Sequence, residues 1–153
     1  ARVVIHKSSQ FRGCEIEGFN KALDSKSIRS RDYVSITESD IRLFGENNYP
    51  PKRGTLLQLS ESEGLLYTRG FVDFYKTYPG MYIPSPLRII AHENDSSLEE
   101  LCEELLGLTK MNWNNTQLDG RLPITIECAK KVGEIMKYVD ENEKPQVSYS
   151  FYM

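Results

Sequence analysis

Amide side chains and two basic residues are concentrated in residues 108–125, LTKMNWNNTQLDGRLPIT. Uncharged amides donate and accept hydrogen bonds, and the flanking cations can bind phosphate oxygens. This combination is suited to holding a phosphate–sugar backbone without reading its base sequence. An ordinary polar surface loop has the same composition, and on composition alone it stays the alternative. The residues concerned are Lys110, Asn112, Asn114, Asn115 and Arg121.

The same run holds the only tryptophan of the chain, Trp113. A lone tryptophan after an apolar helix is most often a core anchor, because its ring buries a large apolar area. We therefore expect Trp113 to pack into the core and its polar neighbours to carry any binding. His6 and His92 show no partner pattern for a triad or a zinc site, so they are expected to be ordinary strand-end histidines.

The composition predicts a soluble chain with one hydrophobic core. With 153 residues, 39% of them hydrophobic, the chain is long enough for one domain. No run reaches the roughly 18 apolar residues that a membrane helix needs. The three cysteines, Cys14, Cys102 and Cys128, form no C-x-x-C pair and are expected to be buried thiols in a reducing cytoplasm.

The charge distribution restricts where an anion would bind. A net charge of -3 argues against holding nucleic acid through a global positive field. Residues 93–104 include six acidic residues and no basic one, whereas basic residues outnumber acidic ones from 105 to 131. Any anion site in the C-terminal part should therefore lie near residues 110–120, which we call the amide loop.

The order of predicted elements is typical of an α/β fold with a mixed sheet. A β-branched run predicts a strand at residues 2–5, alternation predicts one at 32–37, and a short apolar run predicts one at 87–91. Two apolar runs within 55–71, joined by a Ser/Glu/Gly turn, predict a hairpin. Helical spacing of apolar residues predicts a helix over 14–23.

Two further helices are predicted in the C-terminal half. Ser96 and Glu99 have capping-box spacing at the start of a helix over 95–108, whose four glutamates should face solvent. Pro123 is well placed in the first turn of the next helix. The predicted apolar stripe of the first helix is Leu98, Leu101, Cys102, Leu105 and Leu106, and the predicted buried side of the second includes Cys128, Val132, Ile135, Met136 and Val139.

Several segments, in order, resemble the C-terminal half of the PIWI domain of prokaryotic Argonaute proteins. They are PPKRGTLLQL, LLYTRGFV, YPGMYIPSPLRI, the stretch from SLEELCEELLGL to VGEIMKY, and the terminal FYM. The resemblance covers nearly the whole of residues 1–153. It implies an RNase H-like mixed sheet flanked by helices, forming part of a domain that holds a guide strand paired to its target. The MID domain and the first part of PIWI would then lie outside this chain, and the first strand would be central in the complete sheet.

The resemblance also implies contacts to the guide. The amide loop would lie along the guide backbone near its 5′ end, and the implied nucleic-acid-binding residues are Lys110, Asn112, Asn114, Asn115 and Arg121. In several members the terminal carboxylate reaches the MID domain and helps bind Mg²⁺ or another divalent cation at the guide 5′ phosphate. Met153 would supply that carboxylate, and such a cation accepts oxygen ligands. A C-terminal strand that only packs Phe151 and Met153 into the core is the alternative.

Cleaving members of the family hold two divalent ions in a carboxylate-rich cluster. In the resemblance, one aspartate of that cluster corresponds to Ser8 in IHKSSQ, and the last position, an Asp or His, corresponds to Lys130 in ECAKKVG. A hydroxyl is a weak neutral ligand, and an ammonium repels cations. We therefore expect a nuclease-inactive module in which Ser8 and Lys130 are degenerate catalytic positions, unless Glu127 or Asp119 takes one of these places.

The leading hypothesis is a guide-binding module that finds complementary targets in prokaryotic host defence against foreign DNA. Its expected partners are guide and target nucleic acid, the remaining MID/PIWI segment and an effector protein, in the cytoplasm and away from membranes. One alternative is an active guide-directed endonuclease whose missing carboxylates come from another segment or chain. Another is a protein-interaction module in which the acidic face at 93–104 contacts a basic partner. Phosphate and amide contacts do not distinguish DNA from RNA.

Overall fold

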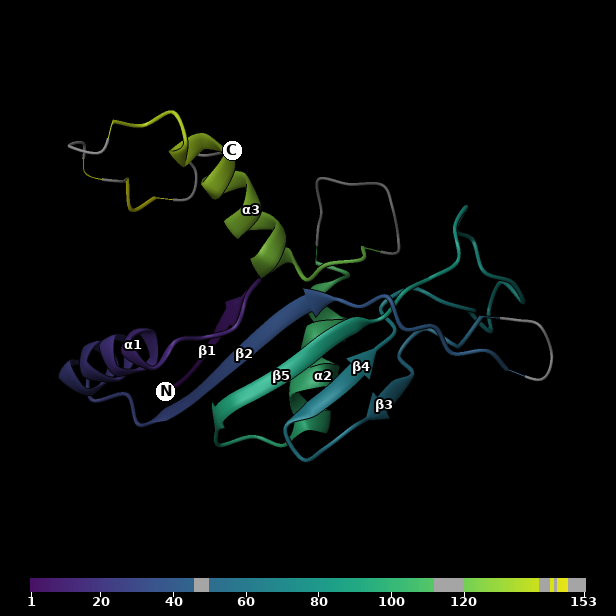
Figure 1. Ribbon diagram of the computed structural model, residues 1–153, viewed down its shortest axis with the longest axis horizontal. Helices are drawn as coiled ribbons and strands as arrows, with labels where there is room; N and C mark the ends of the chain where they lie inside the picture. Colours follow the sequence, from purple (N-terminus) through teal and green to yellow (C-terminus); the bar gives the residue numbers. More distant parts are fainter. Residues whose placement is uncertain (46–49, 112–119, 141–143, 145, 149–153) are drawn as a thin grey trace.

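The computed structural model describes residues 1–45, 50–111, 120–140, 144 and 146–148. In these residues a five-stranded sheet has the order β1-β2-β5-β4-β3, and three helices accompany it (Figure 1). The elements are β1 Arg2–Lys7, α1 Gly13–Ser25, β2 Ser30–Glu38, β3 Leu56–Gln58, β4 Glu63–Leu66, β5 Leu87–Asn94, α2 Leu98–Leu108 and α3 Ile124–Met136. The predicted α/β class with a mixed sheet is confirmed.

The strand pairing mixes both directions. β1 pairs with β2 in parallel, from Arg2 opposite Ser30 to Lys7 opposite Ser35, and α1 makes the crossover that a parallel pair requires. The β2–β5, β5–β4 and β4–β3 pairs are antiparallel, and β3–β4 is the predicted hairpin. Within the described residues β1 lies at one edge of the sheet with β2 as its neighbour.

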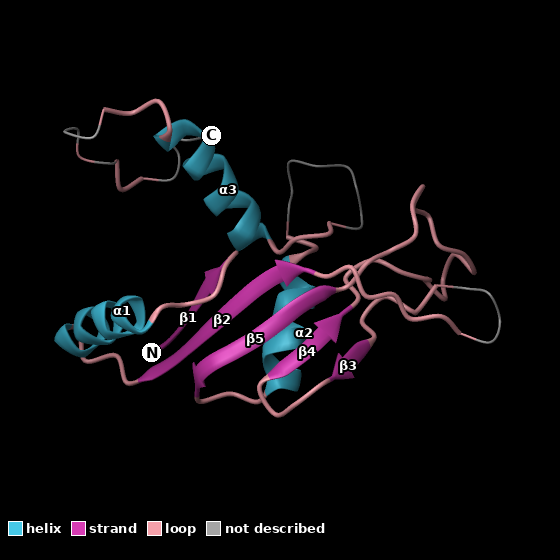
Figure 2. Cartoon of the chain, in the orientation of Figure 1, coloured by secondary structure: helices cyan, strands magenta, loops and turns pink. Residues whose placement is uncertain are grey.

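One face of the sheet packs on α2, which lies behind β5 and β4 in the view of Figure 2. Four residues of the predicted stripe, Leu98, Leu101, Cys102 and Leu105, are buried there, while Leu106 is only half-buried. Their partners in the core are Val34, Ile36, Leu66, Leu87, Ile89, Ala91 and Ile126. Alternation along β2 and β5 supplies these apolar residues, so the core is fixed by period-two patterning against a helical stripe.

The opposite face carries an aromatic cluster beside α1. Tyr33 is fully buried, and its ring centroid lies 5.5 Å from that of Phe11 and 6.2 Å from that of Phe19. Because successive side chains of a strand point to opposite faces, Tyr33 faces away from the α2 side to which Val34 contributes. The Tyr33 hydroxyl donates to Asn20 Oδ1 over 2.8 Å, which ties α1 to this face.

The buried carboxylate of Asp32 ties β2 to β1 and to the start of α2. Asp32 is fully buried and accepts the backbone N–H groups of Asp95 (2.8 Å) and Ser96 (3.0 Å), together with Arg2 Nε (2.7 Å). Burial raises the pKa of Asp32, but the Ser96 N–H, the Arg2 guanidinium and the Asp95 N–H outweigh it, and the net pKa is lowered. The carboxylate is therefore ionised at neutral pH and holds three elements together.

The start of α2 is shifted by one residue from the prediction. Ser97, not Ser96, is the N-cap: its hydroxyl accepts the Glu100 N–H over 3.2 Å, and the Glu100 carboxylate accepts the Ser97 N–H over 3.0 Å. Ser96 is instead bound to Asp32, so a long-range contact decided between two adjacent serines. The four glutamates of α2 are exposed, as predicted.

The predicted buried side of α3 is largely wrong. Ile126 is the buried residue of this helix, whereas Cys128, Val132, Met136 and Val139 are half-buried and Ile135 is 36% exposed. The helix extends away from the sheet beyond its first turns, so the sheet buries only the start of the helix (Figure 1). Pro123 is the N-cap residue, one position before the predicted first turn.

The prediction of three buried thiols is also wrong. Cys102 is buried, Cys128 is half-buried and Cys14 is exposed in the first turn of α1. Among the described residues no helix is both long enough and apolar enough to pass through a membrane.

Candidate nucleic-acid interface

The end of β1 meets the start of α3. His6 Nδ1 and Thr125 Oγ1 lie 2.8 Å apart, which joins the strand that precedes Ser8 to the helix that carries Lys130. Ser8 is two residues beyond His6, and Lys130 is five residues beyond Thr125, roughly 7 Å along either element. The two degenerate positions predicted from the sequence are thus carried by elements that touch at this point.

Neither degenerate position offers a carboxylate or an imidazole. Ser8 and Lys130 are both exposed. Of the two acidic residues considered as replacements, Glu127 is half-buried in the first turn of α3 and Asp119 lies outside the described residues. In the part of the chain that the structure describes, no three His, Cys, Asp or Glu side chains are grouped so that they could hold a metal ion.

The backbone that follows β1 is held by α1 and by the sheet. Lys7 Nζ pairs with Glu15 Oε2 over 2.5 Å and donates to the Gln10 carbonyl over 3.2 Å. The Ser35 hydroxyl donates to the Ser9 carbonyl over 2.9 Å. Ser8 therefore lies between two residues, Lys7 and Ser9, that have fixed internal partners.

Each of the two histidines has a hydroxyl partner within the protein, Thr125 for His6 and Ser35 for His92. Because Ser35 donates its only hydroxyl proton to Ser9, His92 Nε2, at 2.8 Å from Ser35 Oγ, is the donor in that pair. Burial, with a smaller effect of Lys7, lowers the pKa of His92. Burial also lowers the pKa of His6 and outweighs the opposing effect of Glu104. Both rings are neutral near pH 7, which agrees with their prediction as ordinary strand histidines.

The amide loop leaves the end of α2 and returns at the start of α3. Lys110 is exposed at its first position, and Gly120 and Arg121 stand at its return. The predicted contacts Asn112, Asn114 and Asn115, and the predicted core residue Trp113, lie outside the described residues. The structure therefore describes the two ends of this loop and both of its predicted basic contacts.

The two ends of the amide loop are in direct contact. A Cβ on Gly120 would lie 2.4 Å from the Thr109 carbonyl oxygen, which only glycine allows. Thr109 is buried, and its Oγ1 accepts Arg53 Nη2 over 2.7 Å. Arg53 Nε also donates to the Thr68 carbonyl over 2.8 Å, and Thr68 Oγ1 donates to the Arg121 carbonyl over 2.7 Å. This chain of bonds, which we call the loop clamp, fixes where the amide loop begins and ends.

The side chain of Arg121 has partners within the protein. Its Nη2 donates to Ser85 Oγ over 2.8 Å and lies 3.3 Å from Glu38 Oε2. The Arg121 side chain is about one-third exposed and that of Glu38 about one-half, so both reach solvent. An anion arriving from solvent would therefore compete with Glu38 for the Arg121 guanidinium.

Sequence patterns missed four residues that position this site: Arg53, Thr68, Ser85 and Glu38. Arg53 contacts Thr109, and the other three contact Arg121, in each case across more than thirty positions of sequence. The contact between Arg53 and Thr68 spans a shorter distance in sequence. Arg53 follows Lys52 in PPKRG. No local sequence pattern indicates that Arg53 belongs to the loop clamp while Lys52 is exposed. Met153, the predicted source of a metal-binding carboxylate, lies outside the described residues.

Comparison with known proteins relates this chain to Argonaute. No protein-family model matches it. A curated relative, protein argonaute of Aquifex aeolicus, is 24% identical over 136 residues, which is 89% of this chain and 18% of that protein. The chain thus spans less than one-fifth of the length of the relative it matches.

Solved Argonaute structures share the fold. Clostridium butyricum Argonaute bound to a guide DNA and a 19-mer target DNA aligns with a TM-score of 0.69 at 22% identity, over 92% of this chain and 18% of that one. Aquifex aeolicus Argonaute with externally bound siRNA aligns with a TM-score of 0.70 at 22% identity, over 95% and 19%. The chain is therefore Argonaute-related, and its five-stranded sheet with three helices has the fold of one part of an Argonaute chain.

Proposed function

We propose that this chain binds guide and target nucleic acid as the C-terminal part of a nuclease-inactive PIWI domain. The observation that carries the binding role is the loop clamp. It holds closed an amide-rich segment that has Lys110 at its start and Arg121 just after its end. Cations and neutral amides presented together on one loop suit a phosphate–sugar backbone, because such contacts position a strand without reading its bases.

The related proteins support the nucleic-acid partner. The Clostridium butyricum structure contains a guide DNA and a target DNA, and the Aquifex aeolicus structure contains an siRNA. These ligands belong to proteins of which this chain covers only 18% and 19%, so their binding is carried over as a proposal. The sequence resemblance to the PIWI C-terminal half supports the same partner.

The absence of cutting is proposed from the side chains at the junction of β1 and α3. Two-metal hydrolysis needs negative oxygens that hold the cations on both sides of the scissile phosphate. Ser8 offers a neutral hydroxyl and Lys130 a positive ammonium, and both side chains are exposed. A strand held here would then be gripped without being hydrolysed.

Two further parts of the proposal concern partners. We propose Mg²⁺ or a similar divalent cation at the guide 5′ phosphate, with the terminal carboxylate of Met153 as one oxygen ligand, which is the ligand type such cations accept. The remaining MID/PIWI segment would complete that pocket. The biological role would be prokaryotic host defence, in which an effector protein acts once a target has been found.

The binding role is tested by measuring affinity for a 5′-phosphorylated guide and its complement at several salt concentrations. Lys110→Ala and Arg121→Ala should each weaken binding and lower the slope of log K against log salt by about 0.7 to 1, since one phosphate contact is lost. Lys26→Ala, at the exposed end of α1, is the matched control and should change neither quantity. Unchanged affinity and slope in both loop variants would reject the proposed interface.

The inactive state is tested separately with guide-matched target in Mg²⁺ and in Mn²⁺. The expected result is bound, uncut target under both ions. A guide-dependent product that disappears on chelation would instead support an active nuclease whose carboxylates come from another segment.

Loss of a protein partner on reversing the charges of Glu99 and Glu103, with nucleic-acid affinity unchanged, would support the protein-interaction role for the exposed acidic face of α2.

A further inference from the structure

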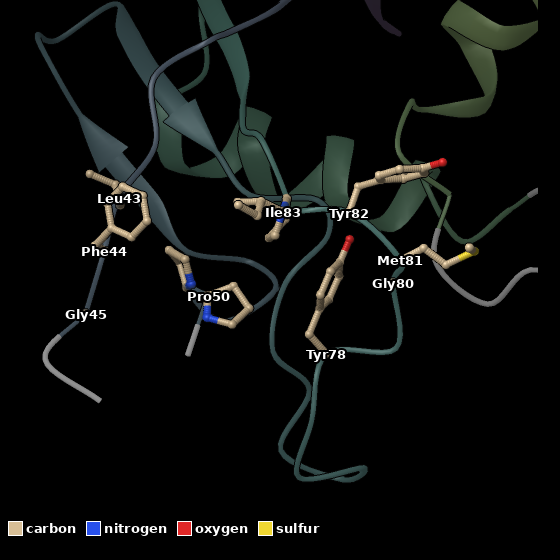
Figure 3. Close-up of a pocket in the computed structure, with 11 residues that line it drawn as sticks. Leu43, Phe44, Gly45, Pro50, Tyr78, Gly80, Met81, Tyr82 and Ile83 are labelled. Atoms are coloured by element: carbon tan, nitrogen blue, oxygen red, sulfur yellow. The ribbon is translucent and has the colours of Figure 1, made fainter. Parts of the chain in front are cut away.

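A second candidate binding site lies at the loop end of the sheet. Residues 43–45, 50 and 51 on one segment and residues 78 and 80–84 on another line a cavity of about 410 Å³. Figure 3 shows Phe44 and Pro50 on one side and Tyr78, Ile83 and Tyr82 on the other. The cavity falls in the size range of small-ligand pockets, which is roughly 300–1,000 Å³.

Part of the cavity lining has a restricted backbone. A Cβ on Gly80 would lie 2.1 Å from the Tyr78 ring, so that ring rests directly on the glycine backbone. Pro50, Pro51 and Pro84 also line the cavity, and each proline ring restricts its backbone to a narrow range of φ. These restrictions lower the cost of ordering the lining around a ligand.

The lining selects a flat and uncharged group. Among the described residues that line the cavity, none carries a charge, and two aromatic rings remain largely in solvent, with Phe44 83% and Tyr82 81% exposed. Exposed rings of this kind stack on nucleobases irrespective of base identity. The basic residues next to the lining in sequence have partners of their own. Lys52 pairs with Asp73 over 2.9 Å, and Arg42 donates to the carbonyls of Ser39 and Ile41.

The cavity is continuous with the candidate nucleic-acid interface. Pro84 lines the cavity, and the next residue, Ser85, accepts the hydrogen bond from Arg121. A strand whose phosphate lies at Arg121 therefore passes within a few residues of the cavity mouth. An unpaired nucleotide of that strand can turn its base toward Tyr82 and Phe44.

We propose that this cavity binds one unstacked base of the guide or of the target strand, held between aromatic rings without base-specific hydrogen bonds. This inference rests on the proposed function and adds a second contact to it. Its chemistry predicts tolerance of all four bases, because the lining offers ring faces and apolar edges. The base is the occupant, and the phosphates stay outside the uncharged lining.

The test uses the protein as its host expresses it and two series of oligonucleotides. One series moves a single abasic site along the guide, and the other moves it along the target, so the two strands are distinguished. In the wild-type protein one position in one series should lose roughly 5- to 100-fold in affinity beyond the loss from pairing, as expected for one stacked base. In Phe44→Leu and Tyr82→Leu that extra loss should vanish. Tyr138→Leu, 92% exposed at the end of α3, is the control and should keep it.

The outcomes separate this inference from the proposed function. If Lys110→Ala and Arg121→Ala weaken binding while no abasic position couples to the cavity variants, the base site is wrong and the backbone site stands. If the wild-type protein binds neither strand, both are wrong. If Phe44→Leu and Tyr82→Leu lower the thermal midpoint of the nucleic-acid-free protein and leave every affinity unchanged, another part of the polypeptide covers the cavity, which also overturns the base site.

Discussion

Arg53 donates a hydrogen bond to the buried hydroxyl of Thr109 over 2.7 Å, across 56 positions of sequence. The contact joins the turn before β3 to the end of α2, and through Thr68 it extends to the backbone of Arg121. Arg53 and Thr68 are not predicted to contact nucleic acid. Their hydrogen bonds nevertheless hold the two ends of the amide loop, where Lys110 and Arg121 are proposed to bind it. The first prediction tests this dependence.

Thr109→Val keeps the shape of the side chain and removes the acceptor for Arg53. The half-buried Arg53 guanidinium loses one of its hydrogen bonds and keeps the bond to the Thr68 carbonyl. Hydrogen bonds to charged groups contribute about 1.5–3 kcal/mol, so the free energy of unfolding should fall by up to that amount. Affinity for the guide should fall as well, and the emission of Trp113, taken as the difference from Trp113→Phe, should change. Thr109→Ser should restore both. Arg88→Met, which removes the exposed pair with Glu63, should leave the Trp113 emission unchanged.

Glu38→Gln should strengthen nucleic-acid binding. The carboxylate lies 3.3 Å from Arg121 Nη2, and a neutral amide in its place would leave that guanidinium free for phosphate. Exposed ion pairs contribute about 0–1 kcal/mol, so a gain of up to about five-fold at low salt is expected. The gain should disappear when Arg121→Ala is added. A gain that persists in the double variant would show that Glu38 acts by general repulsion and not through Arg121.

Gly120→Ala and Gly133→Ala should have opposite effects on stability. At Gly120 the new methyl would lie 2.4 Å from the Thr109 carbonyl oxygen, so the loop ends must separate at a cost of about 1–3 kcal/mol. Gly133 is exposed within α3 and has open space around it. Alanine there should raise the free energy of unfolding by about 0.5–1 kcal/mol through helix propensity. Urea unfolding of the two variants checks the signs, and a stabilised Gly120→Ala would contradict the contact between the loop ends.

Asp32 should make stability depend on acidic pH. Its pKa is lower in the folded state than in the unfolded chain, so its contribution is fully present above the unfolded value near 4 and is lost as pH falls through the folded value. Asp32→Asn removes the charge that accepts the Ser96 and Asp95 N–H groups and Arg2, while Arg2 keeps its pair with Glu104. The loss of these charge-assisted hydrogen bonds should cost about 1.5–3 kcal/mol at neutral pH. The variant should also show a flatter stability profile below pH 4 than the wild type. Chemical denaturation between pH 2.5 and 7 measures both effects, and parallel profiles would contradict the assignment.

Local sequence patterns predicted the strands and helices that bury one side against the core. The alternation in β2 and β5 and the stripe of α2 follow from periodicity, and both were confirmed. The capping serine was misplaced by one residue because Asp32, sixty-four positions away, holds Ser96. Periodicity correctly predicts that one side of α3 is apolar. Whether that side is buried depends on the element that packs against it, which periodicity does not reveal.

The basic residues of the candidate site could be predicted from the sequence, whereas the residues that position them could not. Lys110 and Arg121 stand out because they flank a run of amides. Glu38 and Arg53 become relevant only after the chain has folded, since their contacts span the sheet and the loops around it. The cavity lined by residues 43–45, 50, 51, 78 and 80–84 could likewise not be predicted from the sequence, where its prolines indicated only turns.

Tying the ends of the amide loop from outside has a consequence for how such a chain can change over evolutionary time. The entropy of closing a loop grows slowly with its length, by about 0.6 kcal/mol per doubling. Because Arg53 and Thr68 hold Thr109 and Arg121 in place, a change in the length of the segment between them alters the closure entropy by only a fraction of a kcal/mol. The length of this segment, and with it the reach of its polar groups, can therefore diverge while the bonds that hold its two ends stay the same.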